Sequence, residues 1–227
     1  MPDGSRVDEL FVTEPFAARH PELLARADDD GVRTALVTDR AMSGLTDTVS
    51  PQGCVLVTGL VTRPLREVLV DAGLVAVLLD VADPGNVGTV LRTADAAGAE
   101  AVVLAGDTVD PHNPKSVRAS MGSLFHVGVA HERGVDDVID ALRAAGLGVV
   151  VADSGGETEL GPGTDGLLAR PTAWLFGSEA HGVPEAVAAA ADHRVRIPIR
   201  GRAESLNLAA AAAVCLYASE RARTAST

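Results

Sequence analysis

Hydrophobic positions along the chain fall into two patterns, one before residue 60 and one after residue 74. In residues 1–60, short apolar runs at 9–13, 33–38 and 54–59 alternate with helical stretches such as 15–26. This β-α-β-α-β order predicts a small parallel sheet. From residue 74 the apolar runs are longer and more sharply bounded. We therefore expect two domains, 1–60 and 74–227, joined by a linker at 61–73.

The second region has the pattern of a parallel sheet covered by helices. Residues 74–79 are apolar throughout, as expected of a strand buried on both faces. Further strands are predicted at 101–104, 147–152, 173–176 and 195–199. One helix is predicted after the turn at 83–86, with Asn86 as its cap, and another at 135–145. Their core-facing residues are Val87, Val90, Leu91 and Ala94 in the first helix, and Val135, Val138, Ile139 and Leu142 in the second.

The last predicted helix is built almost wholly of alanine. Residues 208–214 are apolar on every face, which is typical of a helix that is buried on all sides. The apolar run at 208–218 is shorter than the ~20 residues that a membrane span needs. Ser205 and Asn207 stand at the start of this helix, where free backbone N–H groups need a cap or a ligand.

The charge of the chain argues against nucleic acid as a partner only when it is averaged over the whole molecule. The 227 residues carry a net charge of −12, but binding needs only a local basic patch. Two groups of basic residues could contact phosphates: Arg194, Arg196, Arg200 and Arg202, which lie within nine residues, and Lys115 and Arg118, on one face of a short predicted helix. An ordinary solvated surface is the alternative interpretation of the arginine group, and the second group is a weak signal by itself.

The two cysteines and the N-terminus indicate the compartment. Cys54 and Cys215 are far apart and form no CxxC pair, so we expect buried thiols in a reducing environment and no metal site. The first ten residues lack the basic and apolar regions of a signal peptide. A soluble cytoplasmic protein without a membrane partner is therefore predicted.

Two glycine-containing turns could position chemistry at the ends of strands. Residues 83–98 contain Gly85 and Gly88 and place Arg92 on the helix that follows, whereas residues 175–187 run from a strand into a turn with Glu179. Neither has the GxGxxG or GxxxxGK[ST] spacing of a nucleotide site. For the first turn alone a simple N-capping turn is the favoured interpretation, whereas for the second a tight strand-to-helix turn is an equal alternative. His181 is expected to be a turn residue.

Taken together, the order and spacing of these segments are far more specific than any one of them. Residues 74–220 resemble the SpoU (TrmH-type) ribose 2′-O-methyltransferases of the SPOUT superfamily. The three family motifs match Asn86 and Arg92, then Gly177, Glu179 and Gly182, and then Ile197, Pro198, Ser205, Leu206 and Asn207. The stretch KSVRASMGSLF also looks like the family's segment between the first two motifs.

The resemblance implies a fold, a cofactor and a reaction. The fold would be an α/β parallel sheet with a deep trefoil knot at its C-terminal end, and the protein would be a homodimer with RNA bound across it. S-adenosylmethionine would lie against Gly177, Gly182, Ile197, Leu206 and Asn207. The catalytic set would be Asn86, Arg92, Glu179, Ser205 and Asn207. The substrate would be ribosomal or transfer RNA, with ribosomal RNA favoured.

The N-terminal region also resembles a known module. Residues 5–60 are similar to the later part of the small ribosomal-protein-like RNA-binding domain that often precedes this catalytic domain. The first strand and helix usual in that domain have no counterpart in the sequence, so a truncated RNA-binding domain is expected.

Arg92 is the family's usual candidate for proton removal, but a guanidinium stays protonated in proteins. We therefore expect Arg92 to act as a cation that steadies the developing alkoxide or a neighbouring phosphate, with Asn86 and Glu179 orienting it. Two other functions stay open at this point. One is a SPOUT-fold protein that binds RNA without catalysis, and the other is a Rossmann enzyme that acts on a small molecule.

Overall fold

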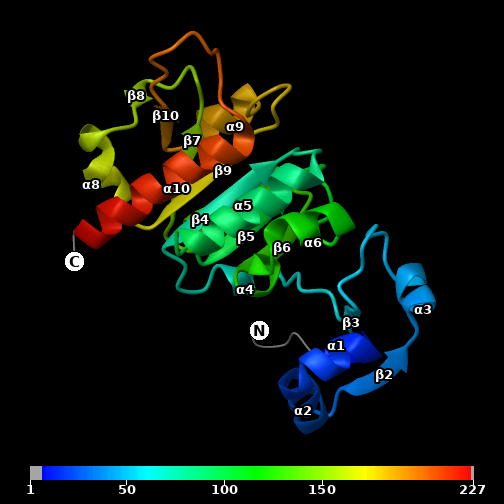
Figure 1. The fold of residues 1–227 in the computed structure, drawn as a ribbon. Helices are drawn as coiled ribbons and strands as arrows, with labels where there is room; N and C mark the ends of the chain where they lie inside the picture. The colour runs from blue at the N-terminus through cyan, green and yellow to red at the C-terminus, as the bar shows by residue number, and fades with distance from the viewer. Residues whose placement is uncertain (1–6, 226–227) are drawn as a thin grey trace. The chain divides into compact units, whose positions relative to one another are not determined.

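The computed structural model describes residues 7–225, so the outermost residues of the two expected domains, 1–6 and 226–227, lie outside the described residues. The chain divides into two compact units, one that extends to Leu60 and one that begins at Val61. Figure 1 shows the elements of both units, most of them labelled.

The N-terminal unit is a mixed sheet with helices packed on it. Within residues 7–60, a three-stranded sheet has the order β2-β1-β3. The strands are β1 (Val7–Thr13), β2 (Arg33–Val37) and β3 (Cys54–Thr58), and the helices are α1 (Glu14–Arg19), α2 (Pro21–Asp29) and α3 (Asp39–Gly44). The expectation of a parallel sheet is only half right, because β1 pairs with β2 in parallel but with β3 antiparallel. Leu10, Val12 and Ala27 form its buried core.

Two further expectations for this unit are corrected. The helix predicted at 15–26 is two helices that break at His20, because a residue before proline is disfavoured in the helical region and Pro21 follows. Cys54 is only half-buried, whereas Cys215 in the larger unit is buried as predicted.

Residues 61–73 are not a free linker but pack into the larger unit. They contain α4 (Leu65–Val68), and Val68, Leu69 and Ala72 are buried in that unit's core. The N–H of Arg63 donates a hydrogen bond to the carbonyl of Val129 over 2.8 Å. The chain therefore enters the larger unit at Val61 rather than at the first long strand.

The larger unit is built on a parallel sheet. Within residues 61–225, seven strands have the order β6-β5-β4-β9-β7-β10-β8, and every pair of neighbours is parallel. The strands are β4 (Leu74–Leu79), β5 (Ala101–Ala105), β6 (Gly128–Glu132), β7 (Gly148–Ala152), β8 (Thr158–Glu159), β9 (Thr172–Phe176) and β10 (His193–Arg196). The pattern of apolar runs predicted β4 correctly, but not β6 or β8. It extended β10 too far, since Pro198 has no N–H for the ladder.

Helices cover both faces of this sheet, and the side chains of β4 alternate between them. Leu74, Ala76 and Leu78 join the core under α5 (Pro84–Ala96) and α10 (Leu208–Ala225), whereas Val75 and Val77 join the core under α4 and α7 (Val135–Ala144). The helices of this unit are α5 (Pro84–Ala96), α6 (Pro114–Ser120), α7 (Val135–Ala144), α8 (Asp165–Leu168), α9 (Glu185–Ala190) and α10 (Leu208–Ala225), with 3-10 turns at Ser123–Phe125 and Pro162–Thr164.

The alanine helix α10 is buried on one side only, which corrects the expectation of burial all round. Leu208, Ala212 and Leu216 face the core, but Val214 is 42% exposed and Tyr217 is 48% exposed. Small side chains let α10 lie close to β9 and α5, as Figure 1 shows. None of the helices in the described residues is long and apolar enough to cross a membrane.

One buried hydrogen bond joins α10 to the centre of the sheet. The indole N–H of Trp174, the chain's single tryptophan, donates to the hydroxyl of Ser219 over 2.9 Å. Both side chains are fully buried. The bond satisfies the polar atom of each and fixes the register of α10 against β9.

Candidate active site

Residues from all three matched motifs meet where β9 ends and where α5 and α10 begin. The side-chain amide of Asn86, in the first turn of α5, donates to Oε1 of Glu179, which follows β9. The side-chain amide of Asn207, just before α10, donates to Oδ1 of Asn86 over 3.1 Å. Three segments that are far apart in sequence are thus joined by one hydrogen-bonded chain of side chains.

The N-terminus of α10 determines which side-chain atoms donate and which accept in these hydrogen bonds. Oδ1 of Asn207 accepts the backbone N–H groups of Ala209 and Ala210, over 3.0 and 3.3 Å, so Asn207 is the N-cap of the helix. Its amide group must then face Asn86, and Asn86 must turn its own amide group to Glu179. The polar residue at the start of the alanine helix is therefore both a cap and part of the site.

Asn86 is free to make these contacts because it is not the cap of α5. Asp83 is the cap, since its Oδ1 accepts the N–H of Gly85 over 3.1 Å. The same oxygen accepts a hydrogen bond from Nζ of Lys115 over 2.6 Å. The Lys115 ammonium and the Gly85 N–H together hold the pKa of Asp83 below its ordinary value.

Gly88, in the first of the two candidate turns, serves helix packing. A side chain at this position would overlap the backbone carbonyl of Ser116 and the methyl group of Ala119 in α6. The glycine therefore lets α5 and α6 approach closely. This packing places the Lys115 end of α6 beside the start of α5.

The second turn is held by a close backbone approach. The N–H of Gly182 donates to the carbonyl of Ser178 over 2.8 Å, and Gly182 has a φ of +66°. A side chain at Gly177 would overlap the carbonyl group of Gly182 and the nitrogen of Val183. Both glycines are thus required by the turn itself, which presents Glu179 to solvent.

A pocket of about 630 Å³ opens beside this network. All five residues predicted to hold a cofactor line it, namely Gly177, Gly182, Ile197, Leu206 and Asn207. Glu179 and Ser205 from the predicted catalytic set line it as well. Its volume lies within the range of small-molecule sites, and its mixture of apolar side chains and backbone groups is typical of them.

Sequence reasoning missed several polar residues of the pocket wall. Asp153 follows β7, Glu185 opens α9, and both pair with the guanidinium of Arg194, over 2.7 and 3.1 Å. Partial burial opposes ionisation of Asp153, but the N–H of Gly155 and the Arg194 guanidinium hold its pKa below the usual value. The alternation of charge along the sequence gave no signal for this cluster, because its members lie on three different elements.

The predicted basic patch is largely neutralised inside the chain. Arg196 and Arg200 both pair with Glu159, over 3.3 and 2.7 Å, and Arg194 and Lys115 are paired as described above. Among the described residues, Arg118 and Arg202 are exposed and have neither an ion pair nor a side-chain hydrogen bond. These two therefore offer more charge to an anion than the other four.

Arg92 lies apart from the network. Six residues beyond Asn86 correspond to a turn of about 120° around the helix, and Arg92 is not among the residues that line the pocket. Its exposed side chain makes no ion pair or hydrogen bond within residues 7–225. It lies on the outer face of α5. The hydroxyl of Tyr217, on α10, donates a hydrogen bond to the carbonyl of Ala96 in the same helix over 3.4 Å.

The profile of the SpoU rRNA Methylase family matches residues 73–217. The chain belongs to this family. The match spans the whole parallel sheet and all three motif segments, and it confirms the family expected from them. The Asn86–Glu179–Asn207 network therefore joins three segments that all lie within the matched range.

Curated SpoU relatives and solved structures agree with this assignment. The 23S rRNA (guanosine(2553)-2′-O)-methyltransferase RlmP of Bacillus subtilis (strain 168) is 35% identical over 191 residues, which are 83% of this chain and 73% of the relative. The 23S rRNA (uridine(2479)-2′-O)-methyltransferase of Streptomyces viridochromogenes is 37% identical over 77% of this chain and 62% of the relative.

Two crystal structures that resemble the chain contain the cofactor AdoMet (S-adenosylmethionine). The AdoMet-bound rRNA methyltransferase from Sinorhizobium meliloti has a TM-score of 0.81 and 33% identity, over 96% of this chain and 81% of that one. The SpoU methyltransferase AviRb from Streptomyces viridochromogenes, in complex with AdoMet, has a TM-score of 0.83 and 31% identity, over 98% and 85%. The α/β fold with its parallel sheet is thus confirmed.

Proposed function

We propose that the chain is an S-adenosylmethionine-dependent RNA methyltransferase that modifies a ribose 2′-hydroxyl of ribosomal RNA. The observation that carries the proposal is the Asn86–Glu179–Asn207 network at the edge of the 630 Å³ pocket. The printed activities of the relatives support the reaction, and their 23S rRNA substrates favour ribosomal over transfer RNA. Because the proposed substrate is ribosomal RNA, we also assign the enzyme to the cytoplasm.

The residues of the pocket fit the cofactor. Ile197 and Leu206 offer apolar surface to an adenine ring, and the Gly177 turn leaves backbone groups open to a ligand. The carboxylate of Glu179, at the pocket and exposed to solvent, suits a cationic ligand. When bound, S-adenosylmethionine supplies an electrophilic methyl group on a positively charged sulfur.

The side chains around the pocket would position the nucleophile. A ribose hydroxyl is a weak nucleophile, so its alignment with the methyl group must contribute much of the rate enhancement. Such alignment can lower an activation barrier by at most ~7–11 kcal/mol. One oxygen of Glu179 is held by Asn86, which leaves the other to accept a hydrogen bond from the hydroxyl. Ser205, which also lines the pocket, adds a second polar contact.

Arg92 would act on RNA rather than on its own chain's pocket. Its cationic side chain is exposed on α5, so it can stabilise a phosphate or the negative charge that develops on the ribose oxygen. The exposed side chains of Val214 and Tyr217 continue this face onto α10. We assign the face to a homodimer, in which Arg92 lies next to the partner protomer and RNA spans both.

The other expected features complete the proposal. The C-terminal segment, from the Gly177 turn through α10, would form the trefoil knot of the superfamily. Arg118 and Arg202 would make the first phosphate contacts, and the paired arginines would contribute when RNA displaces their carboxylates. The N-terminal unit would serve as an RNA-binding module.

The test is to map 2′-O-methylated nucleotides in total RNA from cells with and without the gene. One ribosomal RNA site should lose its methyl group on deletion and regain it with the wild-type gene but not with a Glu179→Gln variant. Full restoration by Glu179→Gln would contradict the assigned role of the network. An unchanged map, together with no methyl transfer to ribosomal RNA in vitro, would refute the proposed function.

A further inference from the structure

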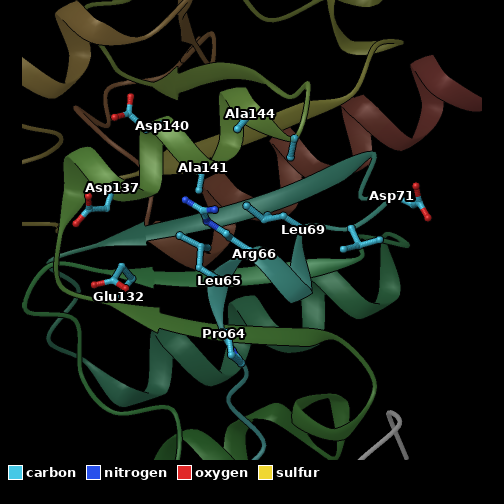
Figure 2. A pocket seen from close by; sticks show the side chains of 12 residues that line it. Pro64, Leu65, Arg66, Leu69, Asp71, Glu132, Asp137, Asp140, Ala141 and Ala144 are labelled. Carbon is cyan, nitrogen blue, oxygen red and sulfur yellow. The ribbon is translucent and has the colours of Figure 1, made fainter.

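The larger unit has a second hollow, of about 880 Å³, on the face of the sheet opposite to α5 and α10. It lies between α4 and α7 (Figure 2). No residue of the Asn86–Glu179–Asn207 network lines it. An occupant of this hollow would therefore not compete with the cofactor for its pocket.

The floor of the hollow is apolar and built from two helices. Leu65 on α4 and Ala141 on α7 are half-buried, while Val70, just after α4, is 69% exposed. Ala144 and Ala145 add small exposed side chains on the α7 side. An apolar hollow between helices that is lined by small residues is the shape that receives an amphipathic helix.

The rim of the hollow is strongly acidic. Four carboxylates, those of Asp71, Glu132, Asp137 and Asp140, surround the floor, and Arg66 is the one basic residue among the lining residues. Figure 2 shows Glu132 and Asp137 at one end and Asp71 at the other. Among the described residues, none of the four has an ion pair. By contrast, Arg194, Arg196 and Arg200 all form ion pairs within the chain.

Three of these carboxylates have little to do for the fold, whereas Oε1 of Glu132 accepts the N–H of Gly134 over 3.2 Å. Asp137 lies in the first turn of α7, where a negative charge stabilises the helix. Asp140 is exposed in the middle of the same helix, and Asp71 is exposed in the turn after α4. Their shared position around an apolar floor is therefore typical of a surface that binds another molecule.

We propose that the groove between α4 and α7 docks a basic amphipathic helix of a partner protein. The apolar side of such a helix would cover Val70 and the alanines of α7, and its lysines or arginines would pair with the acidic rim. The same charge disfavours RNA and anionic lipid as occupants, because four carboxylates repel phosphates. The groove would thus recruit a protein to the face of the unit opposite to α5 and α10.

The experiment uses the full chain and a labelled peptide of about 18 residues, or five helical turns, with leucine and lysine at helical spacing. Binding is followed by fluorescence anisotropy at low salt. Two control peptides are a scrambled order of the same residues and a version with glutamate in place of lysine. Binding of the first peptide alone is the expected result.

Matched variants locate the binding. Asp137→Asn with Asp140→Asn should weaken binding about tenfold, which is about 1.4 kcal/mol, while Asp28→Asn with Asp29→Asn on α2 should leave it unchanged. Val70→Ser should also weaken binding, and Val49→Ser, at a fully exposed valine, should not. All four variants change exposed residues, and circular dichroism checks that each is folded.

Several outcomes would overturn the proposal. Equal loss in the α2 control would show non-specific attraction to an acidic protein. Equal binding of the scrambled peptide would remove the role of the apolar floor. Displacement of the peptide by RNA, or loss of dimers in the Asp137–Asp140 variant by sedimentation, would assign the groove to RNA or to a second copy instead. We expect methyl transfer to be unchanged in the groove variants, because none of the changed residues lines the cofactor pocket.

Discussion

The side-chain amide of Asn207 donates to the side-chain oxygen of Asn86, 121 positions earlier in the chain, over 3.1 Å. The bond joins the start of α10 to the start of α5. Because Asn207 also caps α10, any change in the cap shifts a member of the site. Folding and the chemistry of the site are thus coupled at one residue.

Asn207→Ala and Asn207→Asp separate these two roles. Alanine removes both the cap and the bond to Asn86, so it should cost about 1 kcal/mol of stability as well as activity. Aspartate keeps the cap but has no amide to donate. We expect Asn207→Asp to fold with wild-type stability in urea titrations and to lose methyl transfer nearly as fully as alanine. Wild-type activity in the aspartate variant would contradict a role for the amide.

Arg92→Lys tests whether the planar guanidinium is needed. Since Arg92 is exposed and unpaired within residues 7–225, its replacement should change stability by less than about 0.5 kcal/mol. Single-turnover methyl transfer should fall by roughly 10²-fold, because lysine cannot contact two oxygens of a phosphate at once. The control is Arg133→Lys, at another exposed arginine. A near-normal rate in the Arg92 variant would reduce its role to that of a simple charge.

Gly177→Ala should destroy the turn that holds Glu179. The new methyl group would overlap the Gly182 carbonyl and the Val183 nitrogen, so the backbone must move. We expect loss of S-adenosylmethionine binding in calorimetry and a lower Tm. Gly166→Ala is the matched control, since it lies in α8 with open space around it and alanine favours a helix. Unchanged cofactor binding in Gly177→Ala would show that the turn does not shape the pocket.

RNA binding should depend more on Arg202 than on Arg200. Arg202 is unpaired among the described residues, whereas Arg200 must first leave Glu159, to which it pairs over 2.7 Å. Arg202→Ala should reduce the slope of log K against log salt by about one contact, and Arg200→Ala by less. Equal slopes for the two variants would mean that the ion pair with Glu159 does not limit RNA binding.

Asp83→Asn should change how stability depends on pH. The Lys115 ammonium and the Gly85 N–H lower the pKa of Asp83 in the folded state, so its contribution is present above the ordinary carboxyl pKa and is lost as the pH falls through the lowered value. Asparagine keeps the cap of α5 but has no charge. The variant should be less stable than the wild type at pH 7, by less than about 1 kcal/mol, and equal to it near pH 2.

The measurement for this comparison is urea unfolding at the two pH values, with Asp47→Asn as an exposed control without an ion pair. A gap that persists at pH 2 would show that the difference in stability does not come from the charge of Asp83.

The strands that the sequence predicted best are those that lie in the middle of the sheet. Both faces of β4 are covered, and the strand is apolar at every position. An apolar run of this length is too short for a buried helix, so the pattern predicts a strand. β6 was missed because it ends in two polar residues at the edge of the sheet, the exposed His131 and the half-buried Glu132. β8 has two residues, too few for any periodicity.

For the site, sequence similarity could name the residues but not the bonds between them. The contact of Asn86 with Glu179 and Asn207 depends on how the sheet orders its strands, and no local pattern records that order. The same holds for charge. Glu159 neutralises Arg196 because β8 pairs beside β10 and brings the two residues into register, which a count of arginines cannot reveal.

The bond between Trp174 and Ser219 gives the molecule a built-in optical probe. Indole emission shifts to longer wavelength when the ring meets water, and no other tryptophan in the sequence contributes. The ring is covered by the same helix whose first turn carries the Asn207 cap. The emission maximum of the unlabelled protein therefore reports whether α10 is packed on the sheet. Because α10 forms one wall of the pocket, the same signal reports on the pocket during folding and ligand binding.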